Sequence, residues 1–241
     1  MSEQMNAPML PPSSGVSEWV SVWRDALTKP SDLTFARIAQ SPNAKLTTAL
    51  LWVFLGSLVN ALFASLVEGA IFRQFMQNSN FGGNAFPRAA GGGLVAAICG
   101  APIAAIISVV GFVIFVGVVQ LLARMFGGRG TFEQLAYATA AIVAPFSLVN
   151  SVLTLLSAIP FAGLCFGFVS LLAVLYVVAL EVMAVKGVNG FGWGPALGSY
   201  FLPFLVLICC LSIGVIAILR ALGPGINDIF NSIQQSLTPV P

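Results

Sequence analysis

Histidine is absent from this chain, and charged side chains are scarce: Lys and Arg number 10 and Asp and Glu 8 in 241 residues. Soluble domains have about a quarter of their residues charged, so 7% charged and 58% hydrophobic residues are typical of a membrane protein. The net charge of +2 is small, and the Lys and Arg residues are spread along the chain. This distribution argues against a nucleic-acid partner.

The lack of acid–base groups also limits the chemistry available. Without histidine, a serine or cysteine nucleophile has no usual base, and no lysine lies near one inside an apolar segment. Glu68, Glu133 and Glu181 lie on separate predicted segments, so paired carboxylates for hydrolysis or metal binding are not expected. We therefore predict no catalytic, metal-binding or cofactor-binding residue, and a protein that is not an enzyme.

The four cysteines lie in apolar stretches without CxxC spacing, and we expect them to be small buried apolar residues. Their redox state cannot be derived from this pattern.

Residues 1–15 are polar and contain proline, which predicts a disordered tail without a cleavable signal peptide. The apolar periodicity of residues 16–44 predicts two short helices. The first is amphipathic, with Trp19 and Trp23 on its apolar stripe. The second begins after Ser31 or Asp32. Two interpretations stay open for the first helix: it lies at the lipid headgroup level, or it packs on the cytosolic face of the protein, and the two are compatible.

Residues 45–223 contain five apolar stretches long enough to cross a bilayer core of about 30 Å at about 1.5 Å per residue. The predicted fold is therefore all-α, a multi-pass transmembrane helical bundle. A helical piece, bent at Gly100 and Pro102, should precede the second span. Residues 224–241 form a short extracytoplasmic tail in this scheme. We place the spans at residues 46–67, 102–123, 135–158, 161–185 and 197–219.

Glycine, proline and asparagine within the spans indicate where helices pack. Gly163 and Gly167, four residues apart, allow another helix to approach closely. Pro145 interrupts the third span, and Asn150 follows it by about one turn, where it can bond across helices. These four residues are the predicted helix-packing positions.

Glu181 lies inside the fourth span, five residues before Lys186. An ionisable group within a span is a functional candidate because a charge in lipid is costly. The alternative is a structural polar contact with interfacial water or with Lys186. We predict that Trp19, Trp23, Glu181 and Lys186 contact lipid or a partner.

The segment Gly127-Gly-Arg-Gly130 follows a predicted helix rather than a strand, and it lacks the lysine of a phosphate-binding loop. We interpret it as a turn in which Gly127 and Gly128 adopt the left-handed conformation. Thr131 and Gln134 then form a capping box at the start of the third span.

Seven of the ten Lys and Arg residues fall on the N-terminal side of the membrane in the five-span scheme. The positive-inside rule then predicts a cytosolic N-terminus and an extracytoplasmic C-terminus.

Several short motifs resemble those of the YIP (Ypt/Rab-interacting protein) domain family of polytopic membrane proteins. They are Trp23, Lys29-Pro30, Phe35-Ala-Arg-Ile38, Gly127-Gly-x-Gly-Thr-Phe132, Leu135-Ala-Tyr137, Pro145, Ile159-Pro160, Gly187-Val-Asn189, Ala196 and Pro203. The resemblance implies a five-span helical domain with a cytosolic N-terminus and no catalytic residues. Eukaryotic members act in vesicle traffic with small GTPases. The N-terminal region here is shorter than in those members, which counts against a GTPase partner and favours a prokaryotic plasma membrane.

Three functions remain open from the sequence. The first is a non-enzymatic scaffold that organises membrane or partner proteins. The second is a small channel or transporter, in which Asn60, Asn150 and Glu181 line a midplane site beside Pro102, Pro145 and Pro203. The third is an accessory subunit of a larger membrane complex. Lipids, other membrane proteins and a second copy of the chain are the expected partners.

Overall fold

The computed structural model describes residues 15–78, 93–157, 159, 163–206, 208–209, 211–215 and 220. All regular structure in these residues is helical, which confirms the all-α prediction. Residues 1–14 of the predicted tail at 1–15, the predicted tail at 224–241 and most of the loop after the first span lie outside this set. The chain divides into two compact units, Met1–Ser199 and Tyr200–Pro241.

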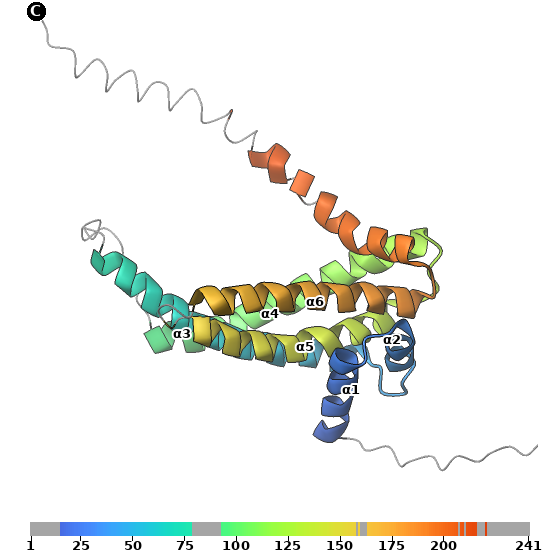
Figure 1. Cartoon of the computed structure of the whole chain (residues 1–241), viewed down its shortest axis with the longest axis horizontal. Coiled ribbons are helices and arrows are strands. Elements are labelled where there is room, and N and C mark those ends of the chain that lie inside the picture. The colour runs from blue at the N-terminus through green and yellow to red at the C-terminus, as the bar shows by residue number, and fades with distance from the viewer. Residues whose placement is uncertain are drawn as a thin grey trace, which may run out of the picture. The chain divides into compact units, whose positions relative to one another are not determined.

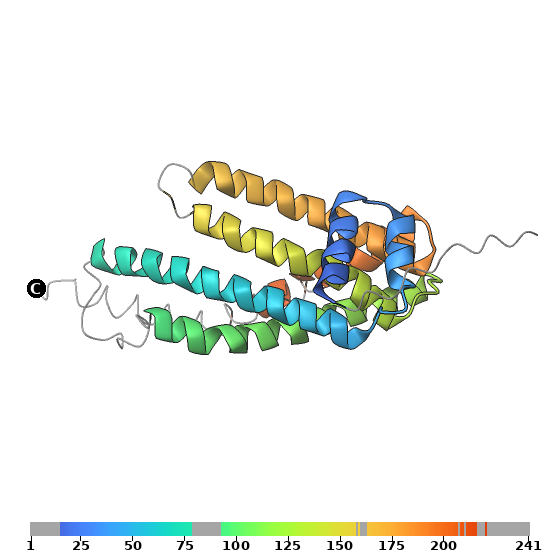
Figure 2. The ribbon, with the colours of Figure 1, turned by 90° about the horizontal axis from the view of Figure 1, so that it is seen from below.

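The first unit is a helical bundle with two short helices at one end (Figure 1). Helices α3 to α6 alternate in direction, and α1 and α2 lie at the end where α3 and α5 begin (Figure 2). Helix α5 is the central element, because it contacts α1, α2, α3, α4 and α6. The bounds of these helices are α1 Val16–Thr28, α2 Asp32–Ala39, α3 Leu46–Asn78, α4 Gly93–Met125, α5 Phe132–Ser157 and α6 Gly163–Asn189.

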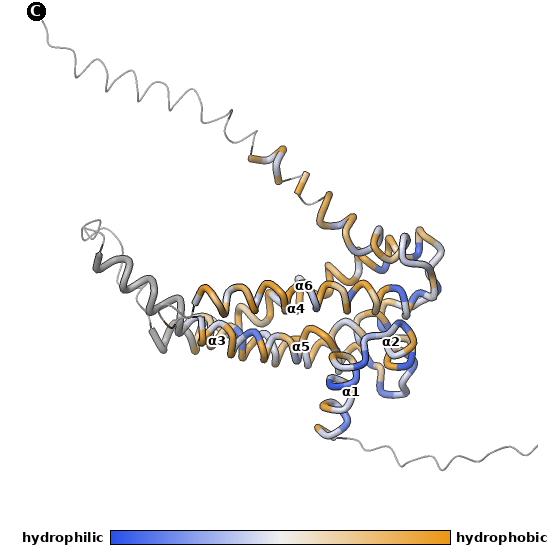
Figure 3. The backbone as a smooth tube through the Cα atoms, viewed as in Figure 1, coloured by the Kyte–Doolittle hydropathy of each residue, from blue (hydrophilic) through white to orange (hydrophobic). Residues whose placement is uncertain are grey.

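Five helices of the described chain are long and apolar enough to cross a membrane, as predicted. Apolar residues run along the full length of these helices, whereas polar residues collect around α1 and α2 (Figure 3). The five spans are Leu46–Ser65, Ile98–Met125, Phe132–Ser157, Gly163–Asn189 and Trp193–Val215.

Three predicted boundaries were wrong. The separate piece before Pro102 is part of α4, which is one helix with Pro102 inside it. A proline in the third turn of a membrane helix removes one backbone hydrogen bond without ending the helix. Helix α6 continues to Asn189, and the fifth span begins at Trp193, so the loop between them is shorter than expected.

The core of the first unit lies along the first half of α5, where Ala136, Ala138, Ala140, Ala141 and Ala144 are all buried. Such small side chains let neighbouring helices approach closely. Gly56 of α3 uses this space, since a Cβ at Gly56 would lie 3.1 Å from the carbonyl oxygen of Ala144. The alanine-rich face therefore determines where α3 crosses α5.

The second unit is described from Tyr200 onward by part of the fifth span. The ring of Tyr200 lies 5.2 Å from that of Phe201 and 5.7 Å from that of Phe204.

The prediction of buried cysteines was wrong for Cys99, Cys165 and Cys209, which are exposed on the protein surface. They lie on apolar spans, where lipid rather than protein packing satisfies a small apolar side chain.

Candidate functional site: the docked N-terminal helices

Helix α1 is attached to the bundle by a cluster of aromatic rings. Trp52 of α3 is fully buried, and its ring centroid lies 5.9 Å from that of Trp19 and 5.6 Å from that of Trp23. Tyr137 of α5 lies on Trp52 with centroids 4.9 Å apart. Edge-to-face aromatic pairs of this kind stabilise a contact beyond the area they bury. The structure thus places both predicted tryptophans against the bundle, as in the second of the two interpretations.

Helix α2 is held by its cap and by an ion pair. The Ser31 hydroxyl accepts a hydrogen bond from the Thr34 N–H at 3.0 Å, so Ser31 rather than Asp32 is the N-cap. The Asp32 carboxylate lies 2.8 Å from Lys186 Nζ of α6. The hydrogen bond from Lys186 holds the pKa of Asp32 below its ordinary value. The Lys186 ammonium also lies 4.6 Å from the ring centroid of Trp193.

Two further contacts attach the N-terminal helices to α6. The Tyr176 hydroxyl donates a hydrogen bond to the Leu27 carbonyl oxygen at 2.6 Å. Gly187 lies against the backbone of Asp32, and a Cβ there would collide with the Asp32 carbonyl oxygen. Only glycine therefore allows α2 to approach α6 this closely.

Glu181 lies between these two attachment points along α6. Its side chain is buried, with 9% exposure. Because Tyr176 and Lys186 on either side of it contact the N-terminal helices, Glu181 belongs to the length of α6 that α1 and α2 accompany. Glu181 therefore lies near the end of the bundle at which α5 begins. Asn150 lies eighteen residues after the first residue of α5, so the two side chains are at different levels of the bundle.

A buried polar network joins the glycine turn to the end of α6. Gln120 Nε2 donates to the Gly130 carbonyl oxygen at 2.7 Å and to Asn189 Oδ1 at 3.0 Å. Asn189 Nδ2 donates to the Val185 carbonyl oxygen at 3.0 Å. A Cβ at Gly128 would lie 2.6 Å from Asn189 Oδ1. The turn is therefore a packing surface for Asn189.

The turn conformation confirms part of the sequence interpretation. Gly127 has φ +88°, in the left-handed region. The same expectation was wrong for Gly128, which does not have a positive φ. Glycine is needed at this position because the backbone lies too close to the Asn189 side chain to admit a Cβ. The capping box is confirmed, since Thr131 Oγ1 accepts from the Gln134 N–H at 3.2 Å and Gln134 Oε1 accepts from the Thr131 N–H at 3.0 Å.

The predicted helix-packing residues lie in different surroundings. Asn150 Nδ2 lies 3.3 Å from Asn60 Oδ1, and the Ser151 hydroxyl lies 3.4 Å from the same oxygen. Pro145 is buried within α5. A Cβ at Gly163 would lie 2.6 Å from the Ser157 carbonyl oxygen, whereas one at Gly167 would have no described atom within 4 Å.

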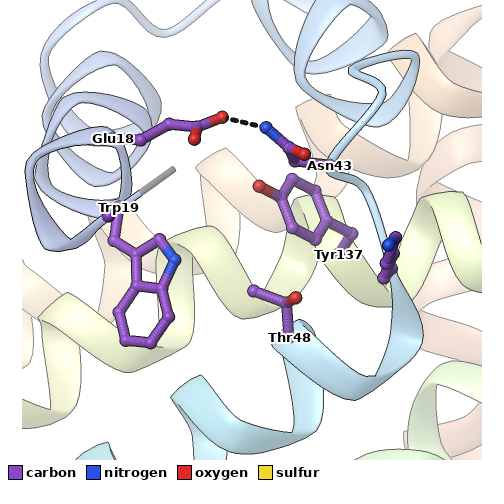
Figure 4. A pocket seen from close by; sticks show the side chains of 7 residues that line it. Glu18, Trp19, Asn43, Thr48 and Tyr137 are labelled. Carbon is purple, nitrogen blue, oxygen red and sulfur yellow. Dashed lines mark hydrogen bonds between the residues drawn. The ribbon is translucent and has the colours of Figure 1, made fainter. Parts of the chain in front are cut away.

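A cavity of about 180 Å³ opens beside the aromatic cluster. Glu18 and Trp19 of α1 border it on one side, and Asn43, Thr48 and Tyr137 border it on the other (Figure 4). Lys45 and Gly15 complete its lining. Asn43 Nδ2 donates a hydrogen bond to Glu18 Oε1 across the cavity.

The Yip1 domain model matches residues 24–214 of the chain. The chain belongs to the Yip1 domain family. This match and the five apolar helices establish a multi-pass membrane protein. Searches among curated proteins and among solved structures found no match.

Two glycine-containing segments that are distant in the sequence meet in the structure. Gly128 and Gly130 pack on Asn189, two residues after the Gly187 that contacts α2. The sequence predicts that these glycines lie in turns, but it does not predict the contact of Gly128 and Gly130 with Asn189. Sequence reasoning also missed Trp52, Gln120 and Tyr176, whose only signal was an aromatic or amide group within an otherwise apolar helix.

Proposed function

We propose that this Yip1 domain protein is a non-enzymatic scaffold that binds or organises other membrane proteins through its α1–α2 face. Residues 16–44 would serve as the partner-facing segment and residues 45–223 as the membrane domain. The observation that supports this proposal most strongly is the fixed position of α1 and α2 on the bundle. Apolar side chains remain exposed on them, with exposed fractions of 70% for Val16, 53% for Val20 and 74% for Leu33.

These three side chains differ in kind from the exposed residues of the spans. Apolar residues on a span face lipid, but α1 and α2 carry polar residues around their apolar ones and lie at the end of the bundle (Figure 3). An exposed apolar patch rimmed by polar residues marks a protein or membrane contact, and Val16 and Val20 lie one turn apart on α1 with both side chains exposed. The rings of Trp19 and Trp23 pack on Trp52, so Val16, Val20 and Leu33 are the candidates for a contact with another protein on the outer side of α1 and α2.

Affinity purification in mild detergent tests the scaffold role. We expect an identified membrane protein, or a second copy of the chain, to co-purify with the wild type. The double variant Val16→Asn/Val20→Asn should lose it, while the exposed Arg37→Gln on α2 should retain it. A monomer without any partner, or a partner that the double variant retains, would contradict the proposal.

The location proposed is a prokaryotic plasma membrane with a cytosolic N-terminus and an extracytoplasmic C-terminus. The support for this orientation is the excess of Lys and Arg on the N-terminal side. We expect a reporter fused after Pro241 to lie outside the cytosol. If a reporter that works only in the cytosol is active at this position, the proposed orientation is reversed. A subunit role in a larger membrane complex is a form of the same scaffold proposal.

A small channel or transporter is the second candidate, favoured by the polar contact of Asn60 with Asn150 and Ser151 between α3 and α5. Glu181 lies at another level of the bundle, so any midplane site would rest on these three residues. Solute uptake into proteoliposomes should then fall in Asn60→Leu and persist in Glu181→Gln. Uptake absent from wild-type proteoliposomes would remove this candidate.

A further inference from the structure

The cavity beside Trp19 presents both signs of charge. Glu18 supplies a carboxylate from α1, and Lys45 supplies an ammonium from the residue before α3. Thr48 and Tyr137 add hydroxyl groups, and Trp19 adds an indole ring whose N–H side faces the same space (Figure 4). The side chains come from four parts of the chain, so the cavity exists only when α1 is docked.

The two charges leave room for a ligand. Glu18 Oε1 accepts from Asn43, which leaves the second carboxylate oxygen for another donor. Among the described residues, Lys45 forms no ion pair, and its side chain is exposed at the cavity. The formal charges of Glu18 and Lys45 cancel. A ligand that carries one cationic and one anionic group matches this arrangement, with the cation near Glu18 and the aromatic rings and the anion near Lys45.

The position of the cavity indicates what the ligand is. Lys45 directly precedes the first span, and Tyr137 lies in the second turn of the third. Helices α5 and α6 contain 26 and 27 residues. At about 1.5 Å per residue each is roughly 40 Å long, which exceeds the ~30 Å hydrocarbon core and reaches into the headgroup region. The cavity therefore opens at the depth of lipid headgroups.

We propose that this cavity binds a phosphoethanolamine-type headgroup of a membrane lipid. The ammonium lies against the Glu18 carboxylate and the Trp19 ring, and the phosphate lies against Lys45 and the Thr48 hydroxyl. A volume of about 180 Å³ is below the ~300 Å³ at which pockets for drug-sized ligands begin, so it fits a headgroup while the acyl chains stay in the bilayer. This site is independent of the scaffold role, because it faces the bundle rather than the outer side of α1.

The test compares lipids on the purified full chain in detergent by native mass spectrometry and thermal unfolding. The probes are phosphatidylethanolamine, phosphatidylglycerol, soluble glycerophosphoethanolamine and inorganic phosphate. We expect phosphatidylethanolamine to bind roughly tenfold or more tightly than phosphatidylglycerol, which lacks the ammonium, because a charge-assisted hydrogen bond is lost. Glycerophosphoethanolamine should raise the Tm less than the lipid, and phosphate should leave it unchanged.

Variants locate the preference within the cavity. Glu18→Gln and Lys45→Gln should abolish it, and Lys29→Gln, a cation at the other end of α1, should keep it. If either variant fails to fold, Thr48→Val should weaken lipid binding without removing a charge. Equal binding of both lipids, an equal shift with phosphate alone, or a preference that survives Glu18→Gln and Lys45→Gln would overturn the site. Binding of glycerophosphoethanolamine as tight as that of the lipid would show that the ligand is a soluble molecule.

Discussion

Gly187 of α6 lies so close to Asp32 of α2 that a single added Cβ would collide with the Asp32 carbonyl oxygen. No flexible side chain can yield at this contact, because the opposing atom belongs to the backbone. The close approach also positions Lys186 to reach the Asp32 carboxylate. Glycine at this position therefore determines how α2 is attached to the membrane domain.

We predict that Gly187→Ala separates α2 from α6 and lowers the free energy of unfolding by about 1–3 kcal/mol, the usual cost of overpacking. Thermal unfolding in detergent and limited proteolysis of the α1–α2 segment provide the measurement. Gly167→Ala is the control, since a Cβ there has no described neighbour within 4 Å. Equal effects of the two substitutions would contradict the prediction.

The ion pair between Lys186 and Asp32 predicts a dependence on pH. Lys186 lowers the pKa of Asp32 from its ordinary value of 3.8. The pair's contribution to stability is therefore fully present above that value and is lost as the pH falls through the lowered pKa of the folded chain. We expect the Tm difference between the wild type and Asp32→Asn to be constant near neutral pH and to shrink below pH 3.8. A difference that stays constant into that acidic range would show that the pair contributes nothing.

Trp52 is predicted to hold the N-terminal helices most strongly. It is fully buried, and the rings of Trp19, Trp23 and Tyr137 all lie on it. Trp52→Ala should cost about 3–5 kcal/mol, as for other large-to-small core substitutions. The remaining tryptophan fluorescence should shift to longer wavelength as α1 is released into water. Trp193→Ala, at an exposed ring, should lower the Tm far less, and comparable losses would refute the assignment.

Asn189 is predicted to stabilise the end of the bundle through its buried hydrogen bonds. Asn189→Ala leaves Gln120 without one of its partners, at a cost of about 1–3 kcal/mol for an unsatisfied buried group. The control is Ser108→Ala, because within the described part of the chain the exposed Ser108 hydroxyl bonds to the Ala104 carbonyl oxygen of its own helix. Unfolding midpoints of the two variants decide the matter. A Tm for Asn189→Ala within error of that of Ser108→Ala would refute the prediction.

Span count and helix type could be predicted from the sequence because each depends on local composition. An uninterrupted apolar run of bilayer length has one stable arrangement in lipid, and the capping box of Thr131 and Gln134 closes within four residues. The amphipathic stripe of α1 was equally visible. Whether that stripe faces lipid or protein depends on Trp52, which lies on another helix.

The candidate site could not be assembled from the sequence for the same reason. Its contacts join residues that are far apart in the chain, such as Asp32 with Lys186 and Leu27 with Tyr176. A glycine pattern shows where a backbone has unusual freedom, but it does not show which neighbour uses the space. Gly128 was expected to need a left-handed conformation, and its neighbour Asn189 supplied the reason instead.

The attachment of α1 and α2 to α5 and α6 has a consequence for biosynthesis. The first two helices leave the ribosome long before Lys186 has been made, and the surface on α6 to which they dock is missing in that interval. At about 5–20 residues per second, synthesis from Asp32 to Lys186 takes roughly ten to thirty seconds. During this time the apolar stripe of α1 is open to chaperones, to the insertion machinery and to the bilayer itself. The contacts of α1 and α2 with α6 therefore form only after most of the chain has been made, and a chain truncated before α6 would lack them.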